Sequence, residues 1–317
     1  MDRRSFSCYG SKLMFKRRRD FGLSFGFFMG HRWAILFFAS VLFSSMLVCG
    51  QENSPAKAPS AKALLEVERL VTVQNGEIPI ILSAPHGGTR RIPGVTARKG
   101  ENVKQFVTVT DTNSHRLAQA LAKAIEKKWG KPYLIVAQFA RQYLDANRPV
   151  SDAMESELAK PVYEAYHTAL DQAIQDARKR WGRGLLLDLH GQAAAKSVIF
   201  RGTANGKTCS LLLERLGPDG LMGKEGLLGL LHERGYQIVP KPGSTDKEDS
   251  RYNGGHIVRT YGASSGTGID AVQLEFGGDF RKEANIEKSA EDLADAVFRF
   301  ADSYFAEIKA STSGKAP

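Results

Sequence analysis

The stretch IPIILSAPHGGTR, from Ile78 to Arg90, decides how the fold begins. An apolar run of this length is typical of a buried strand. The run stops at a proline, a histidine and two glycines, which predicts a strand that ends by presenting the His86 imidazole beside bare backbone. We interpret Gly87 and Gly88 as space for a ligand next to that histidine.

Outward from this stretch, predicted strands and helices alternate along the chain. We expect strands at residues 66–74, 78–84, 132–139, 184–190, 236–240 and 270–276. We expect helices at residues 112–130, 158–181, 218–235 and 286–309. This alternation is typical of βαβ units and predicts an α/β fold, in which a single three-layer domain has a mostly parallel or mixed twisted sheet with helices on both faces. The segment 241–268, rich in Gly, Ser and Thr, is predicted to be a functional loop that acts as a lid.

The first 50 residues predict export. An apolar run at residues 34–48 follows Arg32 and leads into small residues, as in a signal peptide cleaved near Gly50, and it is too short for a comfortable membrane span. A lipoprotein anchor through Cys49 is the less favoured alternative. The mature chain is then periplasmic or extracellular, without stable membrane contact. The expected organisation is a leader at residues 1–50, a flexible linker at 51–63 and a catalytic domain at 64–312.

Composition and charge favour a globular domain without a nucleic-acid partner. The chain is 42% apolar and 25% charged, which suits a folded domain. Its net charge of +10 is largely local, because residues 1–50 carry eight Lys or Arg and two acids, and the remainder has a net charge of only +4. No stripe of basic and aromatic residues indicates a nucleic-acid groove. After cleavage Cys209 is the remaining cysteine, so we expect it to be buried and unpaired.

Polar groups follow four of the predicted strands. One strand ends at His86, another ends at His190, a third carries Glu275 near its end, and a fourth runs into the polar segment 140–148. Because ligands bind at the carboxyl ends of strands in open α/β sheets, we expect these groups to form one site. Asp188 and His190 should share a face of their strand, as should Gln273 and Glu275, because side chains alternate along a strand.

Two histidines with a nearby carboxylate indicate a hydrolytic zinc site, which takes three N or O ligands and leaves one position open. His86 and His190 are the first two predicted ligands. Asp111 is the favoured third ligand, although its position before a helix also suits an N-cap. Asp188 is the alternative ligand, or else supports a histidine. One Zn²⁺ is expected, and a similar ligand set also binds other divalent metals such as iron. The alternative without a metal is a hydrogen-bonded polar pair in the core.

Five sequence blocks carry a family resemblance: PHGGT (85–89), ARQYLDANRP (140–149), LDLHG (187–191), YNGGHIVRTYG (252–262) and VQLEF (272–276). In this order they resemble the N-formylglutamate amidohydrolase family, which is distantly similar to zinc carboxypeptidases, over about residues 78–280. The resemblance implies a parallel or mixed sheet between helices. It also implies metal ligands at His86 and His190, a general base at Glu275, and a substrate-binding cluster of Arg141, Asn147 and Arg148.

The chain departs from these families at two places. Zinc carboxypeptidases have a glutamate where this chain has Thr89, which favours Asp111 as the third ligand. The family commonly has Ser-Arg-Tyr where this chain has Ala140-Arg141-Gln142.

The predicted function is a zinc-dependent amidohydrolase that cleaves an N-formyl, N-acyl or peptide-like amide bond. Its substrate is a small-molecule or peptide-like carboxylate. Glu275 accepts a proton from water, and Arg141 stabilises the developing oxyanion. Arg148, together with Asn147, binds the substrate carboxylate.

The predicted loop and the remaining histidines have weaker signals. Gly255 lets backbone approach the substrate. His256 contacts the substrate, although a solvated loop histidine is an equal interpretation. His115, His167 and His232 are interpreted as ordinary surface or partly buried residues.

Two alternatives belong to other classes of protein. One is an exported, non-catalytic binding protein on the same fold. The other is a serine hydrolase, because GASSG at residues 262–266 matches the motif in which Ser264 is a nucleophile. The sequence favours no particular oligomeric state. An exported enzyme meets peptides, cell-wall fragments or other acyl amino acids, so the substrate itself is left open.

Overall fold

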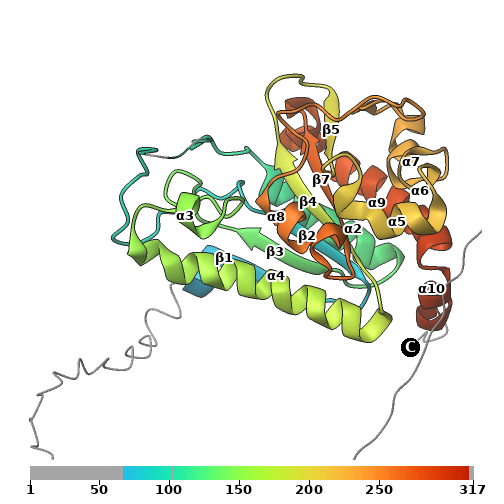
Figure 1. Cartoon of the computed structure of the whole chain (residues 1–317), viewed down its shortest axis with the longest axis horizontal. Helices are drawn as coiled ribbons and strands as arrows, with labels where there is room; N and C mark the ends of the chain where they lie inside the picture. Colours follow the sequence, from blue (N-terminus) through green and yellow to red (C-terminus); the bar gives the residue numbers. More distant parts are fainter. Residues whose placement is uncertain (1–66, 102, 104, 314–317) are drawn as a thin grey trace, which may run out of the picture. The chain divides into compact units, whose positions relative to one another are not determined.

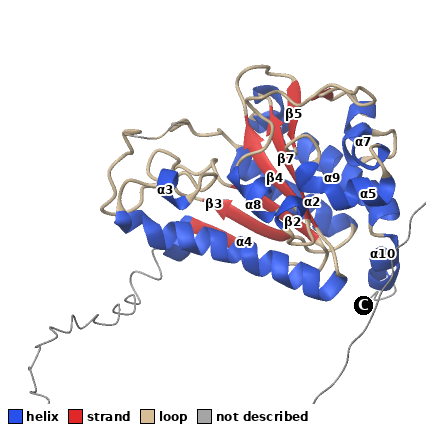
Figure 2. Cartoon of the chain, in the orientation of Figure 1, coloured by secondary structure: helices blue, strands red, loops and turns tan. Residues whose placement is uncertain are grey.

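The computed structural model describes residues 67–101, 103 and 105–313. The predicted leader at 1–50 and the predicted linker at 51–63 lie outside these residues. A seven-stranded sheet lies at the centre, in the order β1-β3-β2-β4-β7-β5-β6 (Figures 1 and 2). Its strands are β1 (Val71–Gln74), β2 (Ile80–Ala84), β3 (Tyr133–Ala137), β4 (Leu185–Gly191), β5 (Val198–Gly202), β6 (Gln237–Val239) and β7 (Asp270–Phe276).

The strand directions make this a mixed sheet. Strands β2, β3, β4 and β7 are parallel to one another. Strand β1 runs antiparallel to β3, while β5 runs antiparallel to β7 and parallel to β6. Four neighbouring strands therefore end at the same edge of the sheet, and the polar groups predicted to converge lie at or just beyond these ends.

The described helices and short 3₁₀ turns surround the sheet. The α-helices are α2 (Ser114–Lys128), α3 (Val150–Ala153), α4 (Lys160–Trp181), α5 (Ser210–Leu216), α6 (Asp219–Met222), α7 (Leu227–Glu233), α8 (His256–Tyr261), α9 (Ile286–Tyr304) and α10 (Ala306–Ser313). The 3₁₀ turns are η1 (Glu157–Ala159), η2 (Lys207–Cys209), η3 (Ala263–Ser265), η4 (Gly278–Arg281) and η5 (Glu283–Asn285). No helix in this part of the chain is both long enough and apolar enough to span a membrane.

Helices cover both faces of the sheet, which confirms the predicted three-layer α/β fold. On one face α2 and α9 pack together, and their buried side chains, such as Leu117 and Phe300, join a core cluster with strand residues such as Leu187. On the other face α4 and α8 supply residues such as Tyr166 and Ile257 to a second cluster. Figure 1 shows α4 along one side of the sheet and α9 on the other. Each long helix buries one apolar stripe, as amphipathic helices do.

The sequence analysis missed some local structure. Strand β5 and helix α5 were not predicted, and residues 67–70 are helical instead of extended. The region 218–235 holds two short helices, α6 and α7, instead of one, and the predicted C-terminal helix is interrupted at Phe305, between α9 and α10. Cys209 is buried and unpaired, as expected.

The predicted lid segment 241–268 is fastened to the sheet. It contains α8 and η3, so it is not loop throughout. The buried carboxylate of Glu248 accepts hydrogen bonds from the backbone N–H groups of Thr203 and Asn205, just beyond β5. Gly202 lies so close to this segment that a side chain there would meet the backbone of Tyr252 and Gly254. These contacts fasten the segment to the end of β5, where Gly202 is paired with Gln273 of β7.

Candidate functional site

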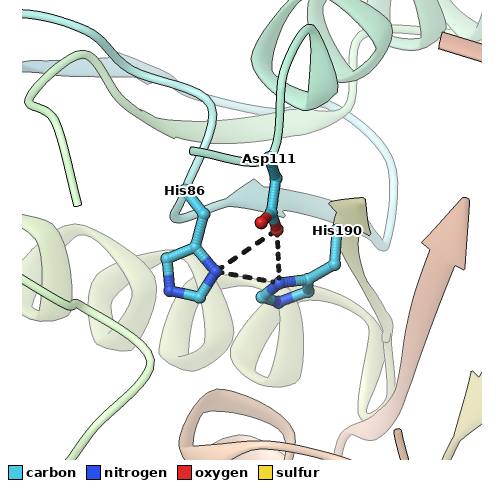
Figure 3. Close-up of side chains that lie close together, drawn as sticks. All are labelled: His86, Asp111 and His190. Atoms are coloured by element: carbon cyan, nitrogen blue, oxygen red, sulfur yellow. Dashed lines mark hydrogen bonds and ion pairs between the residues drawn. The ribbon is translucent and has the colours of Figure 1, made fainter. Parts of the chain in front are cut away.

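Three ligand atoms meet at the carboxyl edge of the sheet (Figure 3). His86 follows β2, Asp111 precedes α2 and His190 lies in β4. The Nδ1 atoms of the two histidines lie 3.1 Å apart. The Oδ2 atom of Asp111 lies 3.4 Å from Nδ1 of His86 and 3.3 Å from Nδ1 of His190. The structure therefore brings together the three residues predicted as metal ligands, all of them buried.

These separations fit a bound metal. Tetrahedral coordination by N and O atoms at about 2.0–2.1 Å places the ligand atoms about 3.3 Å from one another. The three observed separations of 3.1, 3.3 and 3.4 Å lie close to that value. Two histidines and one carboxylate, with an open side toward a cavity, are also the ligand types of a catalytic zinc site. The donor set suits a single divalent ion.

Two further carboxylates contact the histidines at the ring nitrogens that face away from the ligand cluster. Nε2 of His86 lies 2.6 Å from Oδ1 of Asp145, and Nε2 of His190 lies 2.8 Å from Oδ2 of Asp188. If each Nε2–H donates to its carboxylate, each Nδ1 keeps a lone pair that faces the other ring. Metal-binding histidines are commonly oriented by a carboxylate in this way. Asp188 therefore supports a histidine and is not the third ligand.

The role of Asp145 was not predicted. Asp145 lies in the segment 140–149, whose importance the sequence did indicate, but its contact with His86 crosses 59 residues of sequence. Its second oxygen, Oδ2, accepts a hydrogen bond from Nε of Arg141 at 2.9 Å. Asp145 thus links a proposed ligand to a proposed catalytic residue.

The electrostatics of the site favour a positive charge between the two imidazoles. Burial opposes ionisation of Asp111, but hydrogen bonds and charge from His190 and His86 outweigh burial and hold the pKa of Asp111 well below its ordinary value. Burial also opposes the imidazolium of His190, yet the charge of Asp188 and hydrogen bonds to Asp111 and Asp188 hold the pKa of His190 well above its ordinary value. The donor set is thus suited to hold a proton or a metal cation, and metal binding displaces such a proton.

Backbone contacts fix Asp111 and His190 in place. The backbone N–H of Asp111 donates to the carbonyl of His86 at 3.0 Å, and the N–H of Gly191 donates to Oδ2 of Asp111 at 3.1 Å. Helix α2 begins after Asn113, whose left-handed φ is 64°, so Asp111 is not the N-cap. The carboxylate of Asp111 is therefore turned toward the histidines.

Arg281 joins the segments that carry these ligands. Its guanidinium is buried and donates to the backbone carbonyls of Thr112, Gln192 and Phe276. Thr112 directly follows Asp111, and Gln192 lies two residues after His190. No local pattern predicts this contact, because it joins residues far apart in the chain.

The interpretation of Gly87 and Gly88 as space for a ligand is wrong. A side chain at Gly87 would lie 2.4 Å from the backbone nitrogen of His115, at the start of α2. A side chain at Gly88 would lie 2.3 Å from the backbone of Gln138, just beyond β3. These glycines let the protein's own backbone pack closely around the turn that carries His86.

Glu275, the predicted general base, lies beside the ligands. In the register of β4 and β7, Glu275 is paired with His190, and Gln273 with Asp188. The predicted shared face of these four residues is therefore confirmed. Burial raises the pKa of the Glu275 carboxyl above its ordinary value, and the charge of Asp111 raises it further, against the opposing charge of His190. Gln273 donates to Oε1 of Glu275 at 2.9 Å.

The predicted substrate-binding cluster lies close to the same ligands. Arg141 is buried and ion-paired with Asp145 and, at 3.7 Å, with Asp111. The Nδ2 atom of Asn147 lies 3.3 Å from Nε2 of His190, and its Oδ1 accepts from the backbone N–H of Ile257. Arg148 is half-buried, and its guanidinium donates hydrogen bonds to the backbone carbonyls of Gln105 and Asn147. Within the described part of the chain, Arg148 has no carboxylate partner.

Gly255 and His256 differ in their relation to the cavity. Gly255 lines it, but a side chain there would lie 2.3 Å from Nδ2 of Asn147, so its lack of a side chain makes room for Asn147. His256 is not among the lining residues. Its Nε2 instead lies 3.5 Å from the hydroxyl of Tyr163, and its ring packs at an edge against His167. The predicted contact of His256 with substrate has no support in this geometry.

A cavity of about 1040 Å³ opens onto this site. Small-molecule sites usually occupy about 300–1,000 Å³, so the volume lies just above that range. Asp111 and Glu275 are its acidic lining residues, and they are outnumbered by cations. The cationic lining residues are Arg141, Arg148, Arg251, Arg259, Arg281 and Lys282. Three of these cations are ion-paired with acids outside the lining: Arg141 with Asp145, Arg251 with Asp249 and Lys282 with Asp279. The other three cations still outnumber the two lining acids, so the cavity favours an anionic ligand.

Ser264 has no place in this site. It is exposed in η3 and does not line the cavity. A nucleophile elbow needs a strand before the serine and a helix after it. Here α8 precedes η3 and β7 follows it. His115, His167 and His232 also do not line the cavity, in agreement with their interpretation as ordinary residues.

Part of the chain matches a known protein family. Residues 151–280 match the family model described as N-formylglutamate amidohydrolase. The matched range contains His190 and Glu275, while His86 and Asp111 precede it.

Two curated relatives are each named N-formylglutamate deformylase. The chain is 25% identical to the Pseudomonas putida protein over 274 residues, which cover 72% of this chain and 91% of that protein. It is 23% identical to the Pseudomonas aeruginosa protein over 248 residues, which cover 66% of this chain and 84% of that protein.

A solved structure shares the fold. The structure of N-formylglutamate amidohydrolase from Ralstonia eutropha superposes with a TM-score of 0.52 at 18% sequence identity, covering 77% of this chain and 99% of that one. At this identity the likeness bears on the fold alone, and it agrees with the mixed sheet and its covering helices.

Proposed function

On the premise that the chain belongs to the N-formylglutamate amidohydrolase family, which the family model and both curated relatives support, we propose that it is a metal-dependent amidohydrolase. Its substrate is a small N-acyl amino acid that bears a carboxylate, of the type for which the Pseudomonas deformylases are named. One observation carries the proposal: three ligand atoms within 3.4 Å of one another open onto a cationic cavity beside Glu275.

His86, Asp111 and His190 hold the metal in this proposal, with zinc as the favoured ion. A divalent ion at this position supplies Lewis acidity, which polarises an amide carbonyl and acidifies water. Asp145 and Asp188 hold the two imidazoles in the tautomer that presents Nδ1.

The remaining side chains supply proton transfer and charge stabilisation. Glu275 takes a proton from the attacking water and returns it to the leaving amine, a role that suits a buried carboxyl whose pKa is raised. Arg141 faces the site with a guanidinium oriented by Asp145, and it stabilises the negative charge that develops on the carbonyl oxygen. Arg148 binds the substrate carboxylate, because its guanidinium has no acidic partner among the described residues.

Export is a further part of the proposal. The apolar run at residues 34–48 and the small residues that follow it support a leader that is cleaved near Gly50. Expression of the full chain, followed by fractionation and intact mass measurement, tests it. A periplasmic or secreted product that begins near residue 51 supports export, and an unprocessed product in the cytoplasm contradicts it.

The test of activity uses purified protein with its metal content measured. Formate release from N-formylglutamate is compared with hydrolysis of N-acetylglutamate, longer N-acyl amino acids and cell-wall peptides. We expect one equivalent of zinc per chain, hydrolysis of at least one acidic N-acyl amino acid, and loss of both metal and activity in His86→Ala. His232→Gln, which changes a histidine of α7 outside the cavity, is the matched control and should retain both.

Other outcomes separate the alternatives. Zinc and acidic ligands bound without turnover of any substrate would indicate a binding protein. Hydrolysis by metal-free protein that is abolished in Ser264→Ala would indicate a serine hydrolase. Circular dichroism of His86→Ala distinguishes loss of the metal from loss of the fold.

A further inference from the structure

We infer that Gln273 is a positioning residue for Glu275, because its amide fixes the orientation in which the Glu275 carboxylate faces the proposed metal site. The inference rests on the proposed function, in which Glu275 acts as general base. Gln273 has this effect without touching substrate, metal or reacting atoms.

The sheet brings the two side chains to the same face. Gln273 and Glu275 are separated by one residue in β7, so their side chains point to the same side. Strand β4 is the parallel neighbour, and its register pairs Gln273 with Asp188 and Glu275 with His190. Gln273 therefore lies beside Asp188, the residue that supports His190. Glu275 lies beside His190 itself.

The direction of the Gln273 amide is determined by a backbone contact. The N–H of Gly255 points at Oε1 of Gln273 at 2.7 Å. A backbone N–H only donates, so the amide oxygen must be the atom that faces Gly255. The Nε2 group must then face the other way, where it donates to Oε1 of Glu275 at 2.9 Å.

The opposite orientation of the amide is excluded by energy. It would place two donors against each other at Gly255 and two acceptors against each other at Glu275. Both side chains are buried, at 4% exposure for Gln273 and 8% for Glu275, so water has little access to replace the lost bonds. A buried polar group without a partner costs about 1–3 kcal/mol, which is enough to select one orientation.

The two carboxylate oxygens of Glu275 therefore have different hydrogen-bond environments. Oε1 is occupied by the Gln273 amide, which leaves Oε2 for proton transfer. Without this donor the carboxylate can rotate away from the site, and misplacement of a reacting group by about 1 Å can reduce the rate about 100-fold. The same Gly255 that orients Gln273 also packs against Asn147, so this glycine contacts both residues.

Two substitutions separate positioning from a purely structural role. Gln273→Glu keeps the size of the side chain and an acceptor for the Gly255 N–H, but it replaces the donor to Glu275 with a second carboxylate oxygen. Gln273→Met removes both hydrogen-bonding groups. The matched control is Gln74→Glu, which removes an equivalent amide donor, to the carbonyl of Pro132, on the edge strand β1 and away from the cavity.

We expect Gln273→Glu and Gln273→Met to lower kcat about 10- to 100-fold, with KM changed by less than about threefold because neither removes a predicted substrate contact. Zinc affinity and melting temperature should stay close to those of the wild type, because Gln273 touches none of the three ligands. Gln74→Glu should retain full kcat. A Gln273→Met enzyme with wild-type kcat overturns the inference, since a side chain that only fills space predicts that result.

A crystal structure of Gln273→Met tests the inference independently of turnover. We expect the Glu275 carboxylate to leave its wild-type position, because methionine offers it no hydrogen-bond donor. An unchanged Glu275 carboxylate overturns the positioning role, whether or not the wild-type protein is an amidohydrolase. If the carboxylate moves but the wild type hydrolyses no acyl amino acid, the positioning stands and the proposed function fails.

Discussion

The imidazoles of His86 and His190 face each other through their Nδ1 atoms at 3.1 Å, although the residues are 104 positions apart in sequence. Their other nitrogens, Nε2, point outward to Asp145 and Asp188. Two lone pairs at this distance repel each other, and the nearby Asp111 carboxylate adds a further negative group. A proton or a metal ion held by these groups offsets the repulsion, and the ligand separations match those around a tetrahedral metal ion.

Removing the charge of either outer carboxylate should weaken metal binding. Asp145→Asn and Asp188→Asn keep the size of the side chain but reduce the basicity of the histidine that each one supports, so we expect zinc affinity to fall about 10- to 100-fold. Competition with a chromogenic chelator at constant pH measures this. Asp176→Asn is the control, because Asp176 bonds to Tyr133 away from the cavity. Equal zinc affinity in all four proteins would show that the outer carboxylates do not tune the site.

A methyl group at position 255 should act through Asn147. The φ of Gly255 is −89°, which any residue can adopt, so the cost of Gly255→Ala comes from contact with the Asn147 amide and not from backbone strain. We expect Gly255→Ala to lower kcat/KM about tenfold or more, in line with an interaction energy of about 1–3 kcal/mol between contacting residues.

The double mutant provides the control for this prediction. In an Asn147→Ala background the contact is absent, so adding Gly255→Ala should reduce kcat/KM by less than about threefold. Additive effects of the two substitutions would mean that Gly255 acts on catalysis by another route.

The role of Arg148 can be tested by its selectivity. Arg148→Gln should raise KM for a substrate with a free carboxylate about 10- to 100-fold, because a hydrogen bond to a charged group contributes about 1.5–3 kcal/mol. The same substitution should change KM little for the corresponding carboxamide, which lacks the charge. Steady-state kinetics on the matched pair of substrates measures the difference. If both substrates are affected equally, Arg148 does not bind the carboxylate.

Protonation of His167 should make the protein less stable in mild acid. Its Nε2 bonds to the carbonyl of Ala146 and its Nδ1 to the hydroxyl of Tyr261, so the folded state holds the ring neutral. Burial, with a contribution from the charge of His256, lowers the pKa of His167 to about 4. The unfolded chain binds this proton near pH 6.5 and the folded chain does not until about pH 4. Stability from this group is therefore complete above pH 6.5 and is lost as pH falls from 6.5 to 4.

The contribution of His167 has an upper limit of about 3.5 kcal/mol, because one pKa unit corresponds to about 1.4 kcal/mol. Urea unfolding at several pH values should show a smaller loss between pH 6.5 and 4 in His167→Gln than in the wild type. His232→Gln controls for loss of a histidine elsewhere. The same pH slope in His167→Gln and the wild type contradicts this assignment.

Where sequence reasoning succeeded, the information was local. Strand β7 begins and ends where its apolar run does, and the polar residues Gln273 and Glu275 alternate with apolar residues in it. The same pattern in β4 identified His190. Parallel strands must end at one edge, so the convergence of His86, His190 and Glu275 followed from topology alone.

Sequence reasoning failed where the structure depends on contacts between residues that are far apart in the chain. Strand β5 is short and is defined by its antiparallel pairing with β7, from Ile199 beside Phe276, which no local pattern shows. The contact of Asp145 with His86 depends on how the loop after β3 folds back. His256 begins α8 and turns toward Tyr163, because the helix start sets its direction. Glycines next to such residues were interpreted as space for ligands, but most of that space is filled by the protein.

The position of a bound metal tests the central claim most directly. A crystal structure of the zinc-loaded protein, with anomalous data collected at the zinc edge, should show one strong peak about 2.0–2.2 Å from each ligand atom. The ligand atoms are Nδ1 of His86, Nδ1 of His190 and one carboxylate oxygen of Asp111. A peak coordinated by other residues, or full hydrolytic activity in crystals and solutions that contain no metal, would contradict the account.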